Sequence, residues 1–476
     1  MSPVKPVILK FGGTSVEDTC AFERVAGIVS AQSETVPIVV VSAMSGVTDA
    51  LLTGVSKASE GALEGATAAL DLHLERHSLV AKDLLRGERA AFENLLKETR
   101  RKIAGLLQYL SQRPRARNVL QDEILSFGER LSASLLSVVL REKGLAACHV
   151  DARRCILTDE EHGRAIPFWP ETERRTREEL QPLIERSHIP VLGGFIGATR
   201  EGVTTTLGRG GSDYTAALIG AAISAREIQI WTDVSGVLTA DPRVVNSART
   251  VSRLSYAEAA ELAYFGAKVL HPKTVHPAVE NKIPLRICNS RAPAEVGTII
   301  GPQGVVSPRG VKSIAHKTGV TTLQITSGRM LGAYGFLRAL FEVFDRHRTA
   351  VDVVTTSEVS VSLSLDDSSS LPAILKDLRQ LGSVEVKDHQ AIICVVGEGL
   401  SSTPGIAARI FGTISDINIS LISQGASRIN LTFVIDEARA REGVSRLHEA
   451  FFEAGPSDLE KKHETVSGEA FLRASH

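Results

Sequence analysis

One short segment of the chain concentrates groups that could bind an anion. Residues 204–216 read Thr-Thr-Thr-Leu-Gly-Arg-Gly-Gly-Ser-Asp-Tyr-Thr-Ala, with Arg209 between glycines and Ser212 ahead of a run of small residues. Glycines let the backbone turn sharply and approach a ligand closely. A helix beginning near Ser212 would present free N–H groups and a positive dipole end, and Arg209 would add a planar guanidinium suited to a carboxylate or phosphate. The segment therefore predicts a site for an anionic ligand.

A second candidate site follows the first apolar run of the chain, residues 7–9. Residues 10–15 read Lys-Phe-Gly-Gly-Thr-Ser, so that a lysine precedes two glycines and two hydroxyl groups. In a Walker A loop the lysine comes after the glycines, so this is a different motif. It could cradle a phosphate, or it could be a tight turn with a solvated lysine. The presence of Arg209 elsewhere in the chain favours phosphate binding.

Two further segments carry weaker signals. Hydroxyl residues of the segment 42–48 follow the apolar run 38–41, but serines in such a place commonly cap a helix. Gly128, Glu129 and Arg130 insert a glycine and two charges into a helical pattern. From that local pattern alone we interpret the two charges as a surface salt bridge.

The segment after residue 230 begins as a strand and ends in a loop rich in hydroxyl and acidic groups. Thr232 and Asp233, at the tip of this strand, could bind a ribose, a base or a metal, and Arg243 could meet a phosphate. Turn chemistry also accounts for Asp241 before its proline. Lys268 lies on the helix expected next, where a single lysine is usually solvated.

Two patterns resemble known sites but lack an essential feature. Gly397 and Gly399 follow a strand and precede a helix, but the third glycine of a dinucleotide fingerprint is replaced by Ser402. His271 and His276 do not share one regular helix face, so we expect no metal site from protein ligands there.

Short apolar runs alternate with helical stretches over the first 300 residues and predict a mostly parallel α/β sheet. Buried apolar strands that alternate with helices are typical of such sheets, with helices on both faces. Ligands bind beyond the carboxyl ends of the strands, which is where the Gly, Ser and Thr turns fall. The strands that we expect are residues 7–9, 38–41, 149–150, 190–192 and 228–231.

Helical periodicity is strongest between the second and third expected strands. Residues 51–117 are Leu- and Ala-rich and heavily charged, and they predict an exposed helical hairpin; residues 119–141 continue as helix. Residues 255–258 have the spacing of a capping box, which predicts a helix that ends near residues 271–272.

A Gly-, Pro- and Ser-rich stretch at residues 301–310 predicts a domain boundary. The chain beyond it contains a weak internal repeat of the order β-α-β-β-α, and the clean alternation of residues 359–365 marks a half-buried antiparallel strand. The first copy comprises residues 320–325, 334–346, 351–355, 359–365 and 371–381, followed by 384–386. The second copy comprises residues 391–396, 405–415, 417–422, 429–435 and 438–452.

Composition indicates an ordinary globular enzyme. The 476 residues include 54 Lys and Arg against 55 Asp and Glu, so no global charge favours nucleic acid or an acidic membrane surface. No apolar run is long enough to span a membrane, and no secretory leader is visible. Five scattered cysteines, an odd number without metal-ligand spacing, suit a reducing compartment. We therefore expect a cytoplasmic protein that binds neither nucleic acid nor membranes.

Taken together, several strings resemble those of aspartate kinases, and most closely the monofunctional, lysine-sensitive bacterial type. The strings are residues 10–15, 194–197, 204–216, 231–243 and 265–272. The resemblance implies an amino-acid-kinase αβα sandwich followed by tandem ACT domains of βαββαβ order. The expected divisions are a catalytic domain at 1–305 with its helical insertion at about 51–117, ACT domains at 315–389 and 390–455, and a polar tail at 456–476.

The resemblance also assigns roles to individual residues. Those implied at the nucleotide are Lys10, Gly12, Gly13, Thr232, Asp233, Leu238, Arg243 and Lys268. Those implied in the aspartate pocket are Ser42, Thr48, Glu129, Phe195, Arg209, Ser212 and Asp213. Those implied at the effector are Met330, Phe336, Leu337, Val351, Asp352, Ser357, Glu358 and Val359. Four of these, Lys10, Arg209, Asp213 and Lys268, are the expected catalytic residues.

The implied reaction is the ATP-dependent phosphorylation of the β-carboxylate of L-aspartate, with Mg²⁺ held mainly by the nucleotide phosphates. Leu238 stands where the family often has a tyrosine near adenine, which leaves open how adenine is held. The resemblance further implies feedback inhibition by lysine and a homodimer formed through the ACT domains, or a tetramer. Threonine as the effector, a kinase for glutamate or acetylglutamate, and an amino-acid sensor without catalysis remain alternatives.

Overall fold

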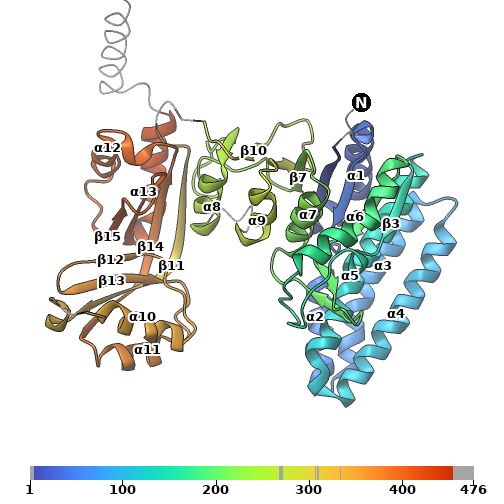
Figure 1. Ribbon diagram of the computed structural model, residues 1–476, viewed down its shortest axis with the longest axis horizontal. Helices are drawn as coiled ribbons and strands as arrows, with labels where there is room; N and C mark the ends of the chain where they lie inside the picture. Colours follow the sequence, from blue (N-terminus) through green and yellow to red (C-terminus); the bar gives the residue numbers. More distant parts are fainter. Residues whose placement is uncertain (1–4, 267–271, 306, 308–309, 333, 454–476) are drawn as a thin grey trace, which may run out of the picture. The chain divides into compact units, whose positions relative to one another are not determined.

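The computed structural model describes residues 5–453 except 267–271, 306, 308–309 and 333, and it divides into two compact units (Figure 1). The first unit comprises Met1–Val237, Ser252–Ala260 and Lys268–Gly304, and the second comprises Leu238–Val251, Glu261–Ala267 and Val305–His476. The change of unit between Gly304 and Val305 lies within the 301–310 stretch. The first unit is not continuous, however, because the segment 238–251 contributes Ala240 and Val245 to an apolar core of the second unit.

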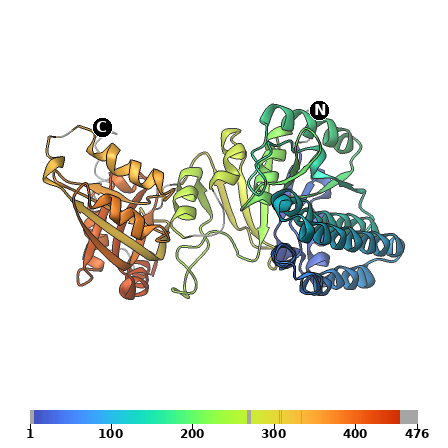
Figure 2. The ribbon, with the colours of Figure 1, turned by 90° about the horizontal axis from the view of Figure 1, so that it is seen from below.

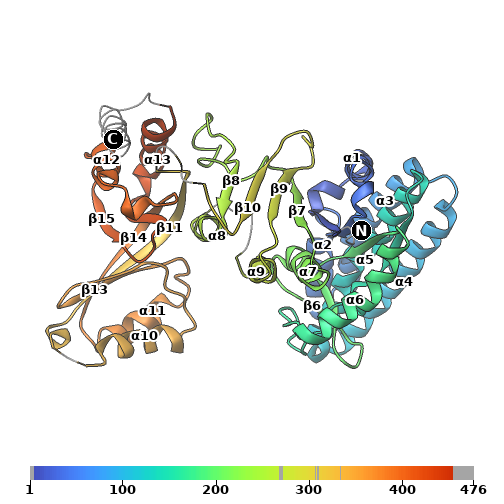
Figure 3. The ribbon, with the colours of Figure 1, turned by 45° about the horizontal axis from the view of Figure 1, so that its top comes forward.

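The first unit is built on an eight-stranded sheet that is mostly parallel, as predicted. The strand order is β3-β4-β2-β1-β7-β9-β10-β8. All neighbours from β3 to β9 are parallel, β10 is antiparallel to β9, and β8 is parallel to β10. Figure 3 shows the succession β7, β9, β10, β8. The strands are β1 (Val7–Phe11), β2 (Ile38–Val41), β3 (Ala147–Val150), β4 (Ile189–Gly193), β7 (Glu227–Thr232), β8 (Arg253–Ser255), β9 (Leu285–Asn289) and β10 (Thr298–Gly301).

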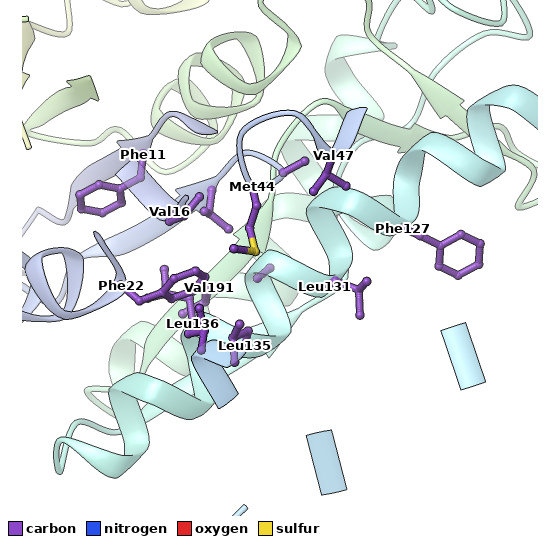
Figure 4. Packing of buried hydrophobic residues seen from close by; sticks show 14 of the residues in the cluster. Phe11, Val16, Phe22, Met44, Val47, Phe127, Leu131, Leu135, Leu136 and Val191 are labelled. Carbon is purple, nitrogen blue, oxygen red and sulfur yellow. The ribbon is translucent and has the colours of Figure 1, made fainter. Parts of the chain in front are cut away.

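Helices cover both faces of this sheet, and strand alternation decides which side chain meets which helix. Leu9 and Phe11 of β1 belong to one apolar cluster with α1 (Thr19–Ala31) and α5 (Arg117–Glu142). Figure 4 shows Phe22 of α1 beside Leu135 and Leu136 of α5 in this cluster. Ile8 points the other way, toward Gly220 of α7 (Gly211–Ala222). This unit also contains α6 (Trp169–Glu185), α9 (Pro272–Glu280) and the first part of α8 (Tyr256–Tyr264), whose last four residues belong to the second unit.

The segment 51–117, predicted as an exposed hairpin, forms part of a helical bundle in which one face of each helix is buried. The segment holds α2 (Val47–Ser59), α3 (Leu63–Leu84) and α4 (Arg89–Gln112), which lie side by side with α5 (Figures 1 and 2). Phe92, Leu96, Ile103 and Leu107 of α4 are buried at helical spacing. The prediction of helices was right, but that of exposure was wrong, because one apolar stripe of each helix joins the main core.

The capping box at Ser255 is confirmed, whereas the expected end of its helix is not. Ser255 N donates to Glu258 Oε2 at 2.7 Å, and Glu258 N donates to Ser255 Oγ at 3.2 Å. Helix α8 ends at Tyr264, and the next described helix begins at Pro272, a residue favoured in the first turn because it lacks an N–H. Lys268 and His271 lie outside the described residues.

The second unit contains a six-stranded antiparallel sheet of order β12-β13-β11-β14-β16-β15. Its elements follow the predicted β-α-β-β-α order twice, and β13 is antiparallel to both neighbours, as expected. The strands are β11 (Ser313–Thr326), β12 (Val354–Thr356), β13 (Ser360–Leu365), β14 (Ser383–Val396), β15 (Ile419–Gln424) and β16 (Asn430–Asp436). The helices are α10 (Phe336–Arg346), α11 (Leu371–Leu378), α12 (Ile406–Thr413) and α13 (Ala440–His448).

The two repeats share their central strands, which the sequence did not predict. Residues 384–386 and 391–396 were expected as separate strands but form the single strand β14. Residues 313–317 of β11 pair with 392–396, while 320–326 pair with 383–390. The expected division between residues 389 and 390 therefore falls inside one strand. Within the described part of the chain, no helix has the length and apolar character needed to cross a membrane.

Candidate active site

Strand alternation brings the first predicted cation to the first predicted acid. Because Leu9 and Phe11 point toward α1 and α5, Lys10 between them points to the opposite face, where α7 begins. Lys10 Nζ lies 2.7 Å from Asp213 Oδ1 in the first turn of α7, and both side chains are largely buried. Two motifs separated by 200 residues thus meet at the carboxyl edge of the sheet.

A cavity of about 540 Å³ opens beside this ion pair. It lies within the first unit and unites the turns after β1 and β2, helix α5 and the start of α7. Lys10 and Arg209 line this same cavity, and a site that binds two anions side by side needs such a pair of cations. The predicted residues that line it are Lys10, Gly13, Ser42, Thr48, Glu129, Phe195, Arg209, Ser212 and Asp213.

The loop that carries Arg209 is shaped by backbone conformations and close approaches. Gly208 and Gly210, on either side of Arg209, have φ of 76° and 73°, which glycine adopts without steric cost. A Cβ on Gly194, after β4, would lie 2.7 Å from the backbone Cα of Ser212, so only glycine lets the two segments approach this closely. Phe195 N donates to Thr215 Oγ1 at 3.0 Å and fixes the same loop to α7.

Glu129 is a buried carboxyl, and the interpretation of a surface salt bridge was wrong for it. Its side chain lies on α5, is 3% exposed and borders the cavity. Burial raises the pKa of Glu129 to about 8, against the opposing effect of a backbone N–H bond from Ala43. Within the described residues, Glu129 Oε2 has no hydrogen-bond partner. Arg130 pairs instead with Glu123, at 3.4 Å.

The cavity is thus lined by the cations Lys10 and Arg209, by the buried carboxyl of Glu129, whose pKa is raised, and by the N-terminus of α7. Arg209 and Lys10 could each meet an anionic group, while the unpaired oxygen of Glu129 could accept from a cation. A substrate that carries both an ammonium and a carboxylate fits such a set, and the N-terminus of α7 adds favourable potential for an anion.

Comparison with known proteins agrees with this reading. The chain matches the model of the amino acid kinase family over residues 5–289 and an ACT domain over residues 393–451. It is 37% identical over 457 residues to lysine-sensitive aspartokinase 3 of Escherichia coli (strain K12), covering 94% of this chain and 99% of that protein. The chain belongs to the aspartokinase family. It is also 36% identical over 466 residues to the chloroplastic aspartokinase 1 of Arabidopsis thaliana, covering 94% of this chain and 80% of that protein.

Solved aspartokinase structures share the fold. The E. coli aspartokinase III complex with aspartate and ADP aligns with a TM-score of 0.79 at 36% identity, covering 94% of this chain and all of that chain. The complex of the same enzyme with lysine and aspartate aligns with a TM-score of 0.78. The expected aspartokinase fold, an amino-acid-kinase domain followed by ACT-type structure, is thus confirmed.

The residues predicted at the nucleotide of this aspartokinase fall into three groups. Gly12 and Thr232 lie next to each other at the carboxyl edge, because Gly12 N donates to Trp231 O at 3.1 Å. Asp233 follows Thr232 and is exposed. Leu238 and Arg243 belong to the second unit, where the guanidinium of Arg243 pairs with Asp241 at 2.6 Å. Neither residue lines the cavity, and Lys268 lies outside the described residues, so the roles of all three stay predictions.

The predicted effector residues of this aspartokinase lie in the second unit, around the start of α10 and beside β12 and β13. Met330, Phe336 and Val351 pack against the apolar core of the first repeat, while Leu337 and Val359 are exposed. Ser357 and Glu358 lie in the exposed turn between β12 and β13. Their effector role stays a prediction.

Asp352 is the buried acid of that predicted effector set. It accepts a hydrogen bond from Tyr264 Oη, and Lys317 Nζ lies 3.8 Å from its other oxygen. Burial, with the neighbouring carboxyl of Asp366, raises the pKa of Asp352 to about 6.

Sequence reasoning missed a buried acid that supports the aspartokinase cavity. Asp122 of α5 is fully buried and accepts from Thr206 N at 3.1 Å, Thr206 Oγ1 at 2.6 Å and Gly163 N at 3.0 Å. His162 Nδ1 lies 2.8 Å from the same carboxylate. Thr206 and Gly163 line the cavity. The available signal was a charge on the apolar face of a helix, which is unusual unless it is paired.

Proposed function

We propose that this chain transfers the γ-phosphoryl group of ATP to the β-carboxylate of L-aspartate and forms 4-phospho-L-aspartate. This would be the first step of the pathway to lysine, threonine and methionine. The observation that carries the proposal is the single cavity that holds Lys10, Arg209, Glu129 and Asp213 together. The E. coli relative solved with aspartate and ADP supports it.

The acceptor in this reaction needs no general base. A β-carboxylate with a pKa of about 3.9 is already ionised near neutral pH, so its oxygen can attack phosphorus directly. The difficulty is the repulsion between an anionic acceptor and a polyanionic nucleotide. Catalysis then rests on positioning and on charges arranged in advance around the transferred group.

Each cavity residue has a role in this scheme. Arg209 would clamp the α-carboxylate of aspartate with its planar fork, and Glu129 or Asp213 would face the ammonium group. Ser42 and Thr48 would donate hydroxyl hydrogen bonds to the substrate. The two pairings fix the zwitterionic end of aspartate and direct its β-carboxylate away from them, toward the nucleotide.

The nucleotide would bind along the carboxyl edge of β1 and β7. Lys10 and Lys268 would neutralise charge that spreads over the phosphoryl oxygens, and the absence of side chains at Gly12 and Gly13 would let the phosphates approach the backbone closely. Mg²⁺, which lowers the negative charge of the phosphates, would be held mainly by the phosphates themselves.

Regulation would act through the second unit. We propose that free lysine binds at Met330–Val359 residues of the first repeat where two chains pair, and shifts the protein toward a poor kinase. The buried carboxyl of Asp352 could receive an ammonium group of the effector. The E. coli relative, solved with lysine, supports this choice over threonine. A cytoplasmic homodimer or tetramer would be the working form.

One assay separates the candidate activities. The purified chain is incubated with ATP, Mg²⁺ and hydroxylamine, and acyl-phosphate formation is followed as hydroxamate with aspartate, glutamate or acetylglutamate as acceptor. Product with aspartate alone is expected. Product only with another acceptor would reassign the substrate, and product with none would leave an amino-acid sensor. Separate titrations with lysine and threonine test the effector, because indifference to lysine would defeat its assignment.

A further inference from the structure

The helical insertion contacts the backbone of two active-site turns through one arginine. Arg76 lies on α3, and its guanidinium is half-buried. Arg76 Nη1 donates to Ser45 O at 2.6 Å, and Arg76 Nη2 donates to Glu17 O at 2.5 Å. Glu17 ends the 3-10 turn that follows β1, and Ser45 lies in the turn that follows β2. One planar group thus bridges two turns from different strands.

The two bridged turns also touch each other directly. Ser45 N donates to Gly13 O at 3.1 Å, and a Cβ on Gly13 would lie 2.9 Å from Ala43 O. All three of these residues line the cavity beside Lys10. Arg76 is not among the described residues that line the cavity. Its contacts therefore reach the ligand site through the backbone of the turns, from the side of the insertion.

His73, one turn earlier on α3, supports the same contact. Arg76 Nη1 lies 3.2 Å from His73 Nδ1, and the imidazole ring packs under Gly46, where a Cβ would lie 2.9 Å from His73 Cε1. Gly46 has φ of 82° and is the N-cap of α2, so the turn combines a left-handed glycine with a close ring contact.

The direction of the Ser45 carbonyl has a consequence for the cavity. The C=O and N–H of a trans peptide point in opposite directions. Because the Ser45 carbonyl points to Arg76, the N–H of Gly46 in the same peptide points away from Arg76. Gly46 lines the cavity. Arg76 therefore fixes the orientation of a peptide whose donor could meet an anionic oxygen.

We propose that Arg76 is a positioning residue for phosphoryl transfer, tying the turn after β1 to the turn after β2 so that both keep the geometry of the phosphate side of the site. This inference rests on the proposed kinase function. Arg209, Glu129 and Ser212, which would hold aspartate, come from other elements, whereas Ser42 lies in the tied turn after β2 and Thr48 directly follows it. Loss of Arg76 should then slow the transfer step and, through Ser42 and Thr48, weaken aspartate binding by a smaller factor.

The first test compares Arg76→Ala with Arg76→Lys and with Arg100→Ala. Arg100, on α4, pairs with Asp71 at the surface, so its removal deletes the same charge from the same insertion without touching the turns. We expect kcat of Arg76→Ala to fall about 10- to 100-fold, the scale of a misplacement of about 1 Å. The KM for aspartate should rise by a smaller factor than kcat falls, because Ser42 and Thr48 are the only proposed aspartate contacts beside the tied turn. A lysine cannot bridge both carbonyls with a planar fork and should give an intermediate kcat. Millimolar guanidinium should restore part of the activity of Arg76→Ala alone.

The second test is hydrogen exchange at the turns, which does not depend on catalysis. The Ser45 amide, protected by Gly13 O, should exchange faster in Arg76→Ala than in the unaltered chain or in Arg100→Ala. Unchanged kcat in Arg76→Ala would overturn the proposal, as would a fall in kcat without faster exchange at the turns. If Arg76→Ala does not fold, Arg76→Lys carries both measurements. If the unaltered chain does not phosphorylate aspartate, the proposed function fails. The hydrogen-exchange result alone then shows whether Arg76 holds the two turns together.

Discussion

Replacing Glu129 by glutamine tests the central electrostatic feature of the site. The carboxyl of Glu129 is buried at the cavity wall, and burial raises its pKa to about 8 from an ordinary value of 4.5. Glutamine has nearly the same shape and can still accept a hydrogen bond, but it cannot ionise. Glu129→Gln therefore removes the charge that we assign to the ammonium of aspartate while leaving the packing of α5 in place.

The size of the effect follows from the pKa. At pH 7 a carboxyl with a pKa near 8 is ionised in about one molecule in ten, whereas binding an ammonium requires the ionised form. The kcat/KM for aspartate of the unaltered chain should rise about tenfold per pH unit below pH 8 and level off above it. Glu129→Gln should lower the plateau about 10- to 100-fold, the equivalent of a charged hydrogen bond of roughly 1.5–3 kcal/mol, and should abolish the slope.

The same substitution should lower activity but raise the stability of the fold. The folded-state pKa of Glu129 is raised above its unfolded value, so the folded protein holds this proton more tightly. The resulting stabilisation is complete below the unfolded pKa and is lost as pH rises through about 8, at up to roughly 1.4 kcal/mol per pH unit. Glutamine shows no such loss. Glu129→Gln should therefore raise the Tm relative to the unaltered chain at pH 8 more than at pH 5.

Steady-state kinetics across pH 6 to about 9, with thermal unfolding at both ends of the range, measures both effects. Equal pH slopes in the two proteins would refute the assignment of the ionisation to Glu129. A Glu129→Gln variant with normal kcat/KM would remove Glu129 from aspartate binding, whatever its stability.

Three further substitutions probe other parts of the site. Lys10→Ala should lower kcat at least about 100-fold with folding intact, because a preorganised charge donor is lost; near-normal turnover with an unchanged circular dichroism spectrum would exclude Lys10 from the mechanism. Arg209→Lys should raise the KM for aspartate about tenfold through loss of the bidentate fork, and an unchanged KM would place the α-carboxylate elsewhere. Gly194→Ala should destabilise the fold by about 1–3 kcal/mol in chemical denaturation, since its Cβ would lie 2.7 Å from Ser212 Cα; wild-type stability would mean that this contact relaxes freely.

The sequence predicted the parts of the site that depend on local pattern. The apolar run before Lys10 and the small-residue run after Ser212 each define one element, a buried strand and a helix. In a parallel sheet, the carboxyl ends of strands lie at one edge, so the turns that follow them must converge. Alternation along β1 then assigns Lys10 to the α7 face. These steps need no long-range information, and they explain why the Lys10 and Asp213 motifs meet.

The parts that could not be predicted depend on which distant segment lies opposite. The burial of Glu129 depends on Gly193 at the end of β4, where a Cβ would lie 2.9 Å from the backbone of Glu129. The apolar stripe of α4 indicates that one face is buried, but the surfaces that cover it, on α2 and α5, are distant in sequence and do not follow from the pattern within α4. The fusion of two expected strands into β14 likewise depends on pairing with β11, which continues through both repeats.

The described side chains also suggest how the site handles two anionic substrates. Lys10 is neutralised by Asp213, and burial raises the pKa of Glu129 to about 8, so that neither side chain is an unpaired charge at neutral pH. In the proposed reaction, a phosphate would take Lys10 from Asp213, and an ammonium would replace the proton on Glu129. Once a phosphate has taken Lys10, Asp213 is left as a second anion for the ammonium of aspartate. We infer that nucleotide and aspartate strengthen each other's binding, and by linkage the enhancement is equal in both directions. The repulsion between the two anionic substrates is thus offset, because the phosphate that pairs with Lys10 frees the carboxylate of Asp213 to bind the ammonium of aspartate.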